Sequence, residues 1–564
     1  MRILLLCHAF NALTQRLHCE LRSKGHEVSV EFDINDAVTE EAVDLFQPDL
    51  LIAPFLKRAI PASVFEALPC LVVHPGPLGD RGPAALDWAI LEGKKTWGVT
   101  VLQAVAELDA GPVWASRSFA LRQASKSSLY RHEVTEAAVS AVFEALDKYV
   151  AGESPRPVER EASLWRSAPQ QADRSLDWAR DRSETILQKI RSADGMPGLL
   201  SELFGTETYL FDARPCKTSF RPEAEPGTVI GRSGPALAVR TVDGVVWIGH
   251  VRRKSAKAIK LPATAVFAAE ADELQDVPGA YREIAFEEIA GVGYLHFDFY
   301  NGAMGTDACR RMLAAFEAAT QSSVQVLVLT GGGDHWSNGL NLNLIEAADS
   351  PAEESWNNIL AIDDLAETII RTTGKWVISA MGGNAGAGGV FLARAADEVW
   401  IRSATVLNPH YKDMGNLYGS EYWTYLLPKH AGPENADRIA RARWPMGAAE
   451  ALELGLANRV FEADQASFAD KVREAASGLA DQDLTARLTA KAVQRERDER
   501  AKPLADYREA ELARMRRNFF GFDPSYHVAR YNFVRKVAKS RTPLTLATHR
   551  SGRNAVRQRT GTVS

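Results

Sequence analysis

The stretch HPGPLGDRGPAALDWAI at residues 74–90 decides the fold of the first part of this chain. It follows directly on the apolar residues LVV at 71–73, which predict a buried strand, and it leads into a predicted helix. The next strand is predicted from Gly98, and residues 108–113 are typical of a tight loop. We therefore expect His74 and Asp109 on loops at the ends of strands, where open α/β sheets bind their ligands.

Upstream of this stretch, short apolar runs alternate with helical patterns. The runs at 3–10, 28–33 and 49–55 are nearly continuous, as in strands that are buried on both faces of a parallel sheet. Residues 13–25 carry apolar residues at helical spacing and end in glycine. The turn after the first run lacks the GxGxxG pattern of dinucleotide-binding folds. The sequence therefore predicts an α/β domain with an open parallel sheet.

Length and composition limit the class of protein. The chain has 564 residues, which corresponds to about three or four domains. Its net charge is −6, from 66 Lys and Arg against 72 Asp and Glu, so we expect no nucleic-acid partner. No apolar run reaches a membrane span of roughly 18–20 residues, and MRILLLCHAF is typical of a strand rather than a signal peptide. We expect a cytoplasmic enzyme with no membrane partner, and the five scattered cysteines predict neither disulfides nor a metal site.

Changes in composition predict three domains. Residues 150–175 are rich in proline, serine and charge and are typical of a linker, and short strands after them predict a small OB-like β-barrel. Residues 268–278 are acidic and predict a second linker. A new α/β pattern follows, with a helical, arginine-rich tail after about 465. The predicted domains are therefore 1–160, 161–280 and 281–564.

His74 and Asp109 form the first candidate site. An imidazole can donate a hydrogen bond to a tetrahedral oxyanion, while a carboxylate orients it or relays a proton. Taken singly, each residue is also compatible with a structural role, His74 as a cap and Asp109 as a turn former. The order of the motifs at 74–90 and 98–114 resembles the formyltetrahydrofolate-dependent formyltransferase family, and the predicted barrel resembles that family's C-terminal domain.

This resemblance implies a catalytic pair and a formyl donor. His74 and Asp109 would be the catalytic pair, with N10-formyltetrahydrofolate as donor. The pterin would lie against the backbone of Phe55, Leu56 and Lys57. The family's catalytic Asn is replaced here by Val72. A substitute amide could come from Asn11 or Gln15 in the loop after the first strand, although both are equally compatible with solvated loop residues.

Two glycine-containing turns form the second candidate site. They are SNGLNL at residues 337–342 and MGGNAGAGGVF at residues 381–391. Glycine lets the backbone approach a ligand closely, and two amides that converge on one carbonyl oxygen form an oxyanion hole. The alternative is a pair of turns that bind nothing. The spacing of a phosphate-binding loop is absent from both turns.

The two turns, with residues 449–460, resemble the crotonase (enoyl-CoA hydratase/isomerase) superfamily. The resemblance implies that the amides of Gly339 and Gly388 are the oxyanion donors. It also implies coenzyme A as a substrate, with its adenine end at the first turn. The residues expected to contact it there are Ser337, Leu340, Asn341 and Leu342.

The positions of the two hydratase glutamates carry Phe391 and His410, so water addition by two carboxylates is excluded in its usual form. Tyr418 and Glu421 lie three residues apart at a predicted helix start, which would place both on one face. We favour a desolvated Glu421 as a base beside Tyr418, with His410 and Tyr411 as the next candidates. The alternative is a structural helix cap.

The order of both halves on one chain resembles a family of nickel–iron hydrogenase maturation proteins. That resemblance implies formyl transfer from N10-formyltetrahydrofolate to coenzyme A, followed by cleavage of formyl-CoA to carbon monoxide and coenzyme A. It also implies the hydrogenase iron-centre assembly machinery as a partner. Two alternatives stay open: a formyltransferase fused to an ordinary acyl-CoA hydratase or isomerase, and a non-catalytic scaffold in which both sites are degenerate.

Overall fold

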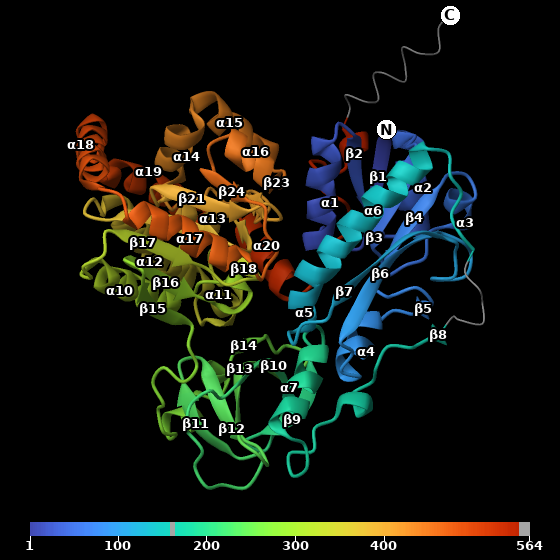
Figure 1. Cartoon of the computed structure of the whole chain (residues 1–564), viewed down its shortest axis with the longest axis horizontal. Helices are drawn as coiled ribbons and strands as arrows, with labels where there is room; N and C mark the ends of the chain where they lie inside the picture. Colours follow the sequence, from blue (N-terminus) through green and yellow to red (C-terminus); the bar gives the residue numbers. More distant parts are fainter. Residues whose placement is uncertain (158–163, 552–564) are drawn as a thin grey trace, which may run out of the picture. The chain divides into compact units, whose positions relative to one another are not determined.

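The computed structural model describes residues 1–157 and 164–551, which form two compact units (Figure 1). Unit 1 comprises Met1–Tyr281 together with the residues from Lys539 onward, and unit 2 comprises Arg282–Ala538. Residues 539–551, expected with the C-terminal half, therefore belong to the N-terminal unit. Part of the linker expected at 150–175, residues 158–163, lies outside the described residues.

Unit 1 begins with a six-stranded sheet in the order β2-β1-β3-β4-β6-β7. The strands are β1 Arg2–Cys7, β2 Glu27–Phe32, β3 Leu50–Phe55, β4 Cys70–His74, β6 Thr96–Gln103 and β7 Val113–Ala120. β2, β1, β3 and β4 are parallel, as predicted, whereas β6 pairs antiparallel with both β4 and β7. The all-parallel sheet is thus corrected at this edge, where β6 is antiparallel to both of its neighbours. The short loop at 104–112 favours the antiparallel pairing of β6 with β7.

Helices cover both faces of this sheet. They are α1 Ala12–Ser23, α2 Asp36–Phe46, α3 Ala62–Phe65, α4 Ala85–Leu91, α5 Lys126–Leu129 and α6 Thr135–Val150, with a π-helical turn at Tyr130–Val134. α6 packs against β6, β7 and α1 (Figure 1). Phe46 of α2 packs with Leu4 and Leu6 of β1, on the face that also carries Val72. Successive strand residues alternate between faces, so Val72 and His74 lie on the same side of β4.

The edge strand β2 is covered by residues from the other end of the chain. Leu546 accepts a 3.0 Å hydrogen bond from the amide of Val30. Glu31 is fully buried, with His549 Nε2 at 3.0 Å and Arg550 Nε at 2.7 Å from its Oε2 atom. Burial acts to raise the pKa of Glu31, but hydrogen bonds from His549, Thr542 and Arg550 outweigh it and hold that pKa below its ordinary value. Residues 542–550 are therefore an integral part of unit 1.

The second part of unit 1 is antiparallel. Its sheet runs β11-β12-β13-β10-β9, with β14 paired to β13. Its elements are α7 Ser183–Ser192, β9 Leu199–Leu203, β10 Thr206–Pro215, β11 Val229–Ser233, β12 Ala236–Arg240, β13 Val245–Arg253, β14 Leu261–Pro262, α8 Ala263–Val266 and α9 Ala268–Asp272. A two-residue pairing of β5 Asp80–Arg81 with β8 Leu164–Trp165 precedes it. The closure of this sheet into an OB-like barrel stays a prediction.

Unit 2 contains two sheets. The larger is β15-β16-β17-β19-β21-β24 and the smaller is β18-β20-β22-β23. The strands are β15 Ile284–Ile289, β16 Val292–Phe297, β17 Val326–Thr330, β18 His335–Ser337, β19 Trp376–Met381, β20 Asn384–Gly386, β21 Glu398–Arg402, β22 Val406–Asn408, β23 Met446–Gly447 and β24 Arg459–Phe461. The first glycine turn follows β18, and the second contains β20, which pairs with β18 in the smaller sheet.

Eleven helices of unit 2 are described. They are α10 Thr306–Thr320, α11 Leu342–Ala347, α12 Pro351–Arg371, α13 Gly388–Arg394, α14 Trp423–Ala431, α15 Pro433–Ala442, α16 Ala448–Glu453, α17 Phe468–Ala480, α18 Thr485–Ala501, α19 Leu504–Phe520 and α20 Ser525–Val534. The helical tail is thus as predicted. In the described part of the chain, no helix is both long and apolar enough to span a bilayer.

α12 shows how the core of unit 2 forms. Pro351 starts the helix, where the missing amide hydrogen is tolerated. Ile362, Leu365 and Ile369 recur at helical spacing and are buried. Asp363 lies in the same buried set, with its side chain fully removed from solvent. A carboxylate on the core side of a helix requires hydrogen-bond partners, and those partners lie in the second candidate site.

Candidate active sites

His74 ends β4 and is held by an acid that was not predicted from the sequence. Its Nε2 atom lies 2.9 Å from Oδ2 of Asp80, and both side chains are buried. Since a carboxylate accepts, Nε2 carries the proton in this pair, and Nδ1 is left as the acceptor in the neutral ring. Asp80 also accepts a 3.1 Å hydrogen bond from Arg166. The only sequence indication is an acidic residue in a glycine-rich loop that must fold back onto the strand end.

Asp109 lies on the other side of the imidazole. Its Oδ1 atom is 3.7 Å from Nδ1 of His74, and its Oδ2 accepts a 3.1 Å hydrogen bond from the amide of Gly82. Its backbone has a φ of 54°, a left-handed conformation that is uncommon outside glycine. The structure therefore brings the predicted pair together, with Asp80 and Asp109 on the two ring nitrogens of His74.

The proposed folate-contact residues surround the neighbouring strand ends. The ring of Phe55 lies 6.2 Å from that of Tyr130, and the amide of Lys57 donates to Asp33 at 3.0 Å. Leu56 packs with the apolar face that also holds Val72. The backbone of these residues therefore lies at the end of β3, beside the end of β4 in the same sheet.

The two candidate substitute amides are engaged by their own loop. Asn11 caps α1, accepting the amide of Thr14 at 3.0 Å, and its Nδ2 atom donates to Tyr130 at 3.3 Å. Gln15 donates from Nε2 to the carbonyl oxygen of Phe10 at 2.9 Å. A role for Asn11 or Gln15 toward the formyl oxygen stays a prediction.

The two glycine turns of unit 2 approach each other closely. A Cβ atom at Gly339 would lie 3.5 Å from the amide nitrogen of Gly388. Gly388 is the first residue of α13, so its N–H has no partner within the helix. The N–H of Gly339 donates to Oγ of Ser337 at 3.1 Å. A substrate oxygen in this hole would therefore share the Gly339 amide with Ser337.

The first turn itself is tightly bonded. Ser337 is fully buried and donates to the thioether sulfur of Met304 at 3.2 Å. Asn341 caps α11, where Leu342 is the first residue, and Leu340 forms an isolated bridge with Met304. Ser337 therefore faces the oxyanion glycines rather than solvent. Contact of this turn with coenzyme A stays a prediction.

The carboxylate of Glu421 lies over Gly388. A Cβ atom placed at Gly388 would collide with Oε1 of Glu421. The other oxygen, Oε2, accepts a 2.6 Å hydrogen bond from the hydroxyl of Tyr411. Burial and the charge of Asp363 raise the pKa of Glu421 to about 8. A carboxylate of that basicity beside Gly388 is equipped to remove a proton from a bound carbonyl compound.

Tyr418 does not occupy the place expected for it. Glu421 precedes α14 and has a φ of 57°, so the helical spacing rule does not apply between residues 418 and 421. The ring of Tyr418 instead lies 5.4 Å from Trp423 and under the guanidinium of Arg514. The tyrosine that contacts the carboxylate of Glu421 is Tyr411.

Aromatic rings replace the missing hydratase glutamates. Phe391, at one glutamate position, stacks on Tyr411 with ring centroids 5.6 Å apart, and Trp423 lies 6.4 Å from Phe391. At the other position, burial lowers the pKa of His410, whose Nε2 atom is 4.0 Å from Asp413. Neither position offers the carboxylate of a hydratase, as the sequence indicated.

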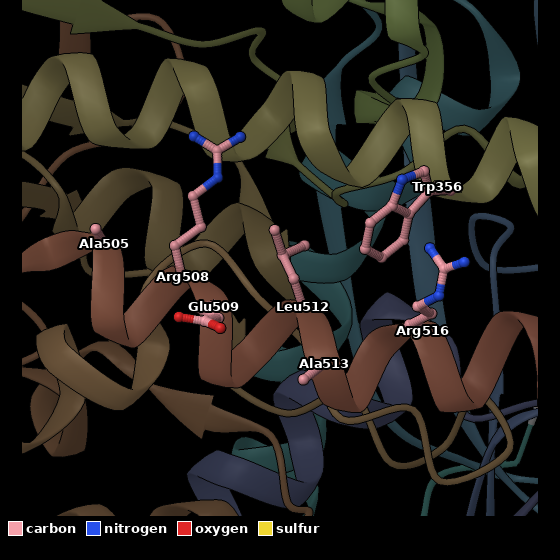
Figure 2. A pocket seen from close by; sticks show the side chains of 7 residues that line it. All are labelled: Trp356, Ala505, Arg508, Glu509, Leu512, Ala513 and Arg516. Atoms are coloured by element: carbon pink, nitrogen blue, oxygen red, sulfur yellow. The ribbon is translucent and has the colours of Figure 1, made fainter.

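A separate groove of about 400 Å³ lies between α12 and α19 (Figure 2). Its lining consists of Trp356, Ala505, Arg508, Glu509, Leu512, Ala513 and Arg516. No predicted catalytic or binding residue belongs to this lining.

Three family models match successive parts of the chain. The formyl transferase model matches residues 22–146, and the formyl transferase C-terminal domain model matches residues 169–266. The enoyl-CoA hydratase/isomerase model matches residues 289–523. A methionyl-tRNA formyltransferase from Enterococcus faecalis is 28% identical over 37% of this chain and 66% of its own length. Fold and sites together thus define a formyltransferase joined to a crotonase-like domain.

Two relatives match along nearly the whole chain. The hydrogenase maturation factor HoxX of Bradyrhizobium diazoefficiens is 58% identical over 98% of this chain and 97% of its own. The crystal structure of HypX from Aquifex aeolicus in complex with tetrahydrofolic acid is 45% identical, with a TM-score of 0.94, over 98% of this chain and 99% of that one. The chain belongs to the HypX/HoxX family of hydrogenase maturation factors.

Proposed function

We propose that this chain makes carbon monoxide for nickel–iron hydrogenase maturation, in two steps at two sites. In the first, the formyl group of N10-formyltetrahydrofolate passes to coenzyme A, giving formyl-CoA. In the second, formyl-CoA is split into carbon monoxide and coenzyme A. Residues 1–160 and 161–280, with the returning segment 539–551, would form the formyltransferase part, and residues 282–538 the crotonase-like part. The product would go to the machinery that assembles the hydrogenase iron centre.

The first step uses the groups around His74. The imidazole of His74 accepts the thiol proton as the sulfur attacks the formyl carbon, which forms a C–S bond and a tetrahedral oxyanion. Collapse of this oxyanion breaks the C–N bond to the folate. The imidazole, which lies between Asp80 and Asp109, then passes this proton to the departing nitrogen. The tetrahydrofolic acid bound to the relative from Aquifex aeolicus supports a folate donor.

The second step is supported most directly by the position of Glu421 over Gly388. A formyl thioester has no α-carbon, so the enolate route of a crotonase is unavailable to it. The amides of Gly339 and Gly388 would hold the thioester oxygen while Glu421 takes the formyl proton. The C–S bond then breaks with its electron pair on sulfur, and carbon leaves as carbon monoxide. The proton on Glu421 passes to the thiolate, so the step needs no oxidant or reductant.

The aromatic surroundings of Glu421 favour this reaction over hydration. Phe391 cannot titrate, and its ring packs against Tyr411 where a hydratase would hold a second carboxylate. A base without a second carboxylate suits bond cleavage better than positioning of water. Bulky rings beside the base also favour an acyl group of one carbon over longer chains.

The experiment is a carbon monoxide assay with isotopically labelled formyl-folate, coenzyme A and the full chain, with haemoglobin as the trap. We expect the label in haemoglobin-bound carbon monoxide only when coenzyme A is present. Label recovered solely as formate would contradict the second step. Hydration of crotonyl-CoA would support the ordinary hydratase fusion, and consumption of neither substrate would support the non-catalytic scaffold.

A further inference from the structure

The turn that carries Glu421 has an unusual backbone. Glu421 and Tyr422 both adopt left-handed conformations, with φ values of 57° and 60°. Two consecutive residues with side chains in this region are unfavourable and persist only where surrounding contacts hold them. The turn is therefore held in place from outside.

Two buried carboxylates from different helices hold this turn. Asp363 of α12 accepts the amide of Glu421 at 2.8 Å and the hydroxyl of Ser420 at 2.7 Å. Glu511 of α19 accepts the amide of Tyr422 at 3.0 Å. Glu511 also accepts the amide of Thr424 at 2.8 Å and the hydroxyl of the same threonine. Asp363 is fully buried and Glu511 is 1% exposed, so both are fixed parts of the core.

These carboxylates also set the electrostatic surroundings of the base. The titratable groups that face Glu421 are Asp363, Glu511, Tyr411 and the buried thiol of Cys309. Burial and the charge of Asp363 raise the pKa of Glu511 to about 8, and burial raises that of Asp363 to about 6. Arg508 acts on Asp363 through its charge, but its own hydrogen bonds go to Asp364 and Glu367 on the outer side of α12.

We propose that Asp363 and Glu511 are positioning residues, which fix the backbone of the turn at 420–424 and so hold the carboxylate of Glu421 over Gly388. The inference rests on the proposed role of Glu421 in formyl-CoA cleavage. It assigns a function to the helical tail, because α19 supplies Glu511. The crotonase-like site is complete only with that helix in place.

The test uses the full chain with Asp363→Asn and Glu511→Gln. Glu353→Gln and Glu509→Gln are matched controls, each removing one exposed carboxylate from the same two helices; Glu509 is visible in Figure 2. Infrared titration follows the protonated-carboxyl band that disappears in Glu421→Gln. We expect Asp363→Asn to move its midpoint to lower pH by about one pH unit, because a neighbouring negative charge is removed. The control variants should keep the wild-type midpoint.

Carbon monoxide release from formyl-CoA provides the second readout. Its rate should rise with pH as Glu421 loses its proton, and this rise should move to lower pH in the same variants. A merely structural role would lower the rate at every pH without moving the midpoint. An unchanged infrared midpoint in folded Asp363→Asn and Glu511→Gln overturns the inference.

The two proposals can fail separately. A wild-type midpoint below pH 5 also overturns the inference, and this measurement needs no variant of Asp363 or Glu511. If wild-type protein releases no carbon monoxide, the proposed function fails. In that case the infrared titration still decides whether Asp363 and Glu511 control Glu421.

Discussion

Glu421 fills the space over Gly388 that any larger residue at that position would need. The contact explains why this position in α13 carries glycine: the base and the oxyanion amide occupy the same few ångströms. Position 388 therefore links substrate binding and proton transfer, and a change there affects both.

Gly388→Ala should reduce carbon monoxide release and leave formyl transfer intact. The added methyl group collides with the Glu421 carboxylate, which must then move away from its place over Gly388. Displacement of a general base typically lowers a rate by about 10²–10⁴-fold, and we expect a loss of that order. The matched control is Gly374→Ala, where an added Cβ has no neighbour within 4 Å. Wild-type carbon monoxide output from folded Gly388→Ala would place the oxyanion hole elsewhere.

Glu421→Gln should consume formyl-folate at the wild-type rate while carbon monoxide output falls. Removal of a general base costs about 10²–10⁴-fold, and formyl-CoA or formate should accumulate. Tyr411→Phe should lower the output more than Tyr418→Phe, because it is the hydroxyl of Tyr411 that donates to the Glu421 carboxylate. Quantifying carbon monoxide and formyl-CoA in the same reaction checks both expectations. A larger loss in Tyr418→Phe would return the assisting role to Tyr418.

His74→Ala and Asp109→Asn should abolish formyl transfer without unfolding the protein. Asp80 keeps Arg166 as a hydrogen-bond partner when the imidazole is removed, and Asn can still accept the amide of Gly82 in place of Asp109, so both variants should stay folded. Asp80→Asn should slow the transfer as well, because it removes the carboxylate that lies 2.9 Å from Nε2 of His74. The control is Glu107→Gln, an exposed carboxylate of the same loop as Asp109. The measurement is the rate at which formyl-folate is consumed. An unchanged rate in all three variants would show that these residues do not carry out formyl transfer.

Stability of unit 2 should fall as the pH rises from about 5 to 9. The pKa of Glu421 is raised from 4.5 to about 8, so the folded state binds this proton more tightly than the unfolded state. The associated stability is complete below pH 4.5 and disappears as the pH passes through 8. Glu421→Gln should therefore flatten the pH dependence of urea unfolding by about 1 kcal/mol or more. An equal pH dependence in wild type and variant would show that Glu421 is not buried as a neutral acid.

His549→Ala should destabilise unit 1 by about 3 kcal/mol, because it leaves the buried carboxylate of Glu31 without one of its partners. The pKa of Glu31 is held low in the folded state, so this stability is present near neutral pH and lost on acidification. Urea unfolding of His549→Ala beside Ser540→Ala, a change at an exposed neighbour, measures the effect. Equal midpoints for the two variants would contradict the packing of the C-terminal segment against β2.

Local patterns predicted much of the fold. Apolar runs located β1 to β4, and the position of His74 followed from the end of such a run. The antiparallel β6 was not predicted, because a strand's direction depends on its connection and not on its own residues. The partner of Glu421 was misassigned for a similar reason. The turn at 421–422 contains no glycine and is held by Asp363 and Glu511, which lie 58 and 89 residues away from the amides they bind.

The return of the chain to β2 was also not predicted. Residues 542–550 have neither helical nor strand periodicity, and their bonds to Glu31 span 518 residues in the case of His549. Such contacts depend on charge and shape that only the folded unit presents. Asp80 was not predicted either, although it lies close to His74 in the sequence. Its hydrogen bond to His74 depends on how a glycine-rich loop closes.

The covering of β2 by residues 542–550 has a consequence for synthesis of the protein. A ribosome translates β2 about 500 residues before the segment that satisfies its edge. Throughout that interval the nascent sheet presents unpaired backbone groups, which is the condition under which chains associate wrongly or recruit chaperones. Translation that stops within unit 2 would yield a first unit that lacks residues 542–550, the segment that covers β2. Completion of the first unit is thereby coupled to translation of the second.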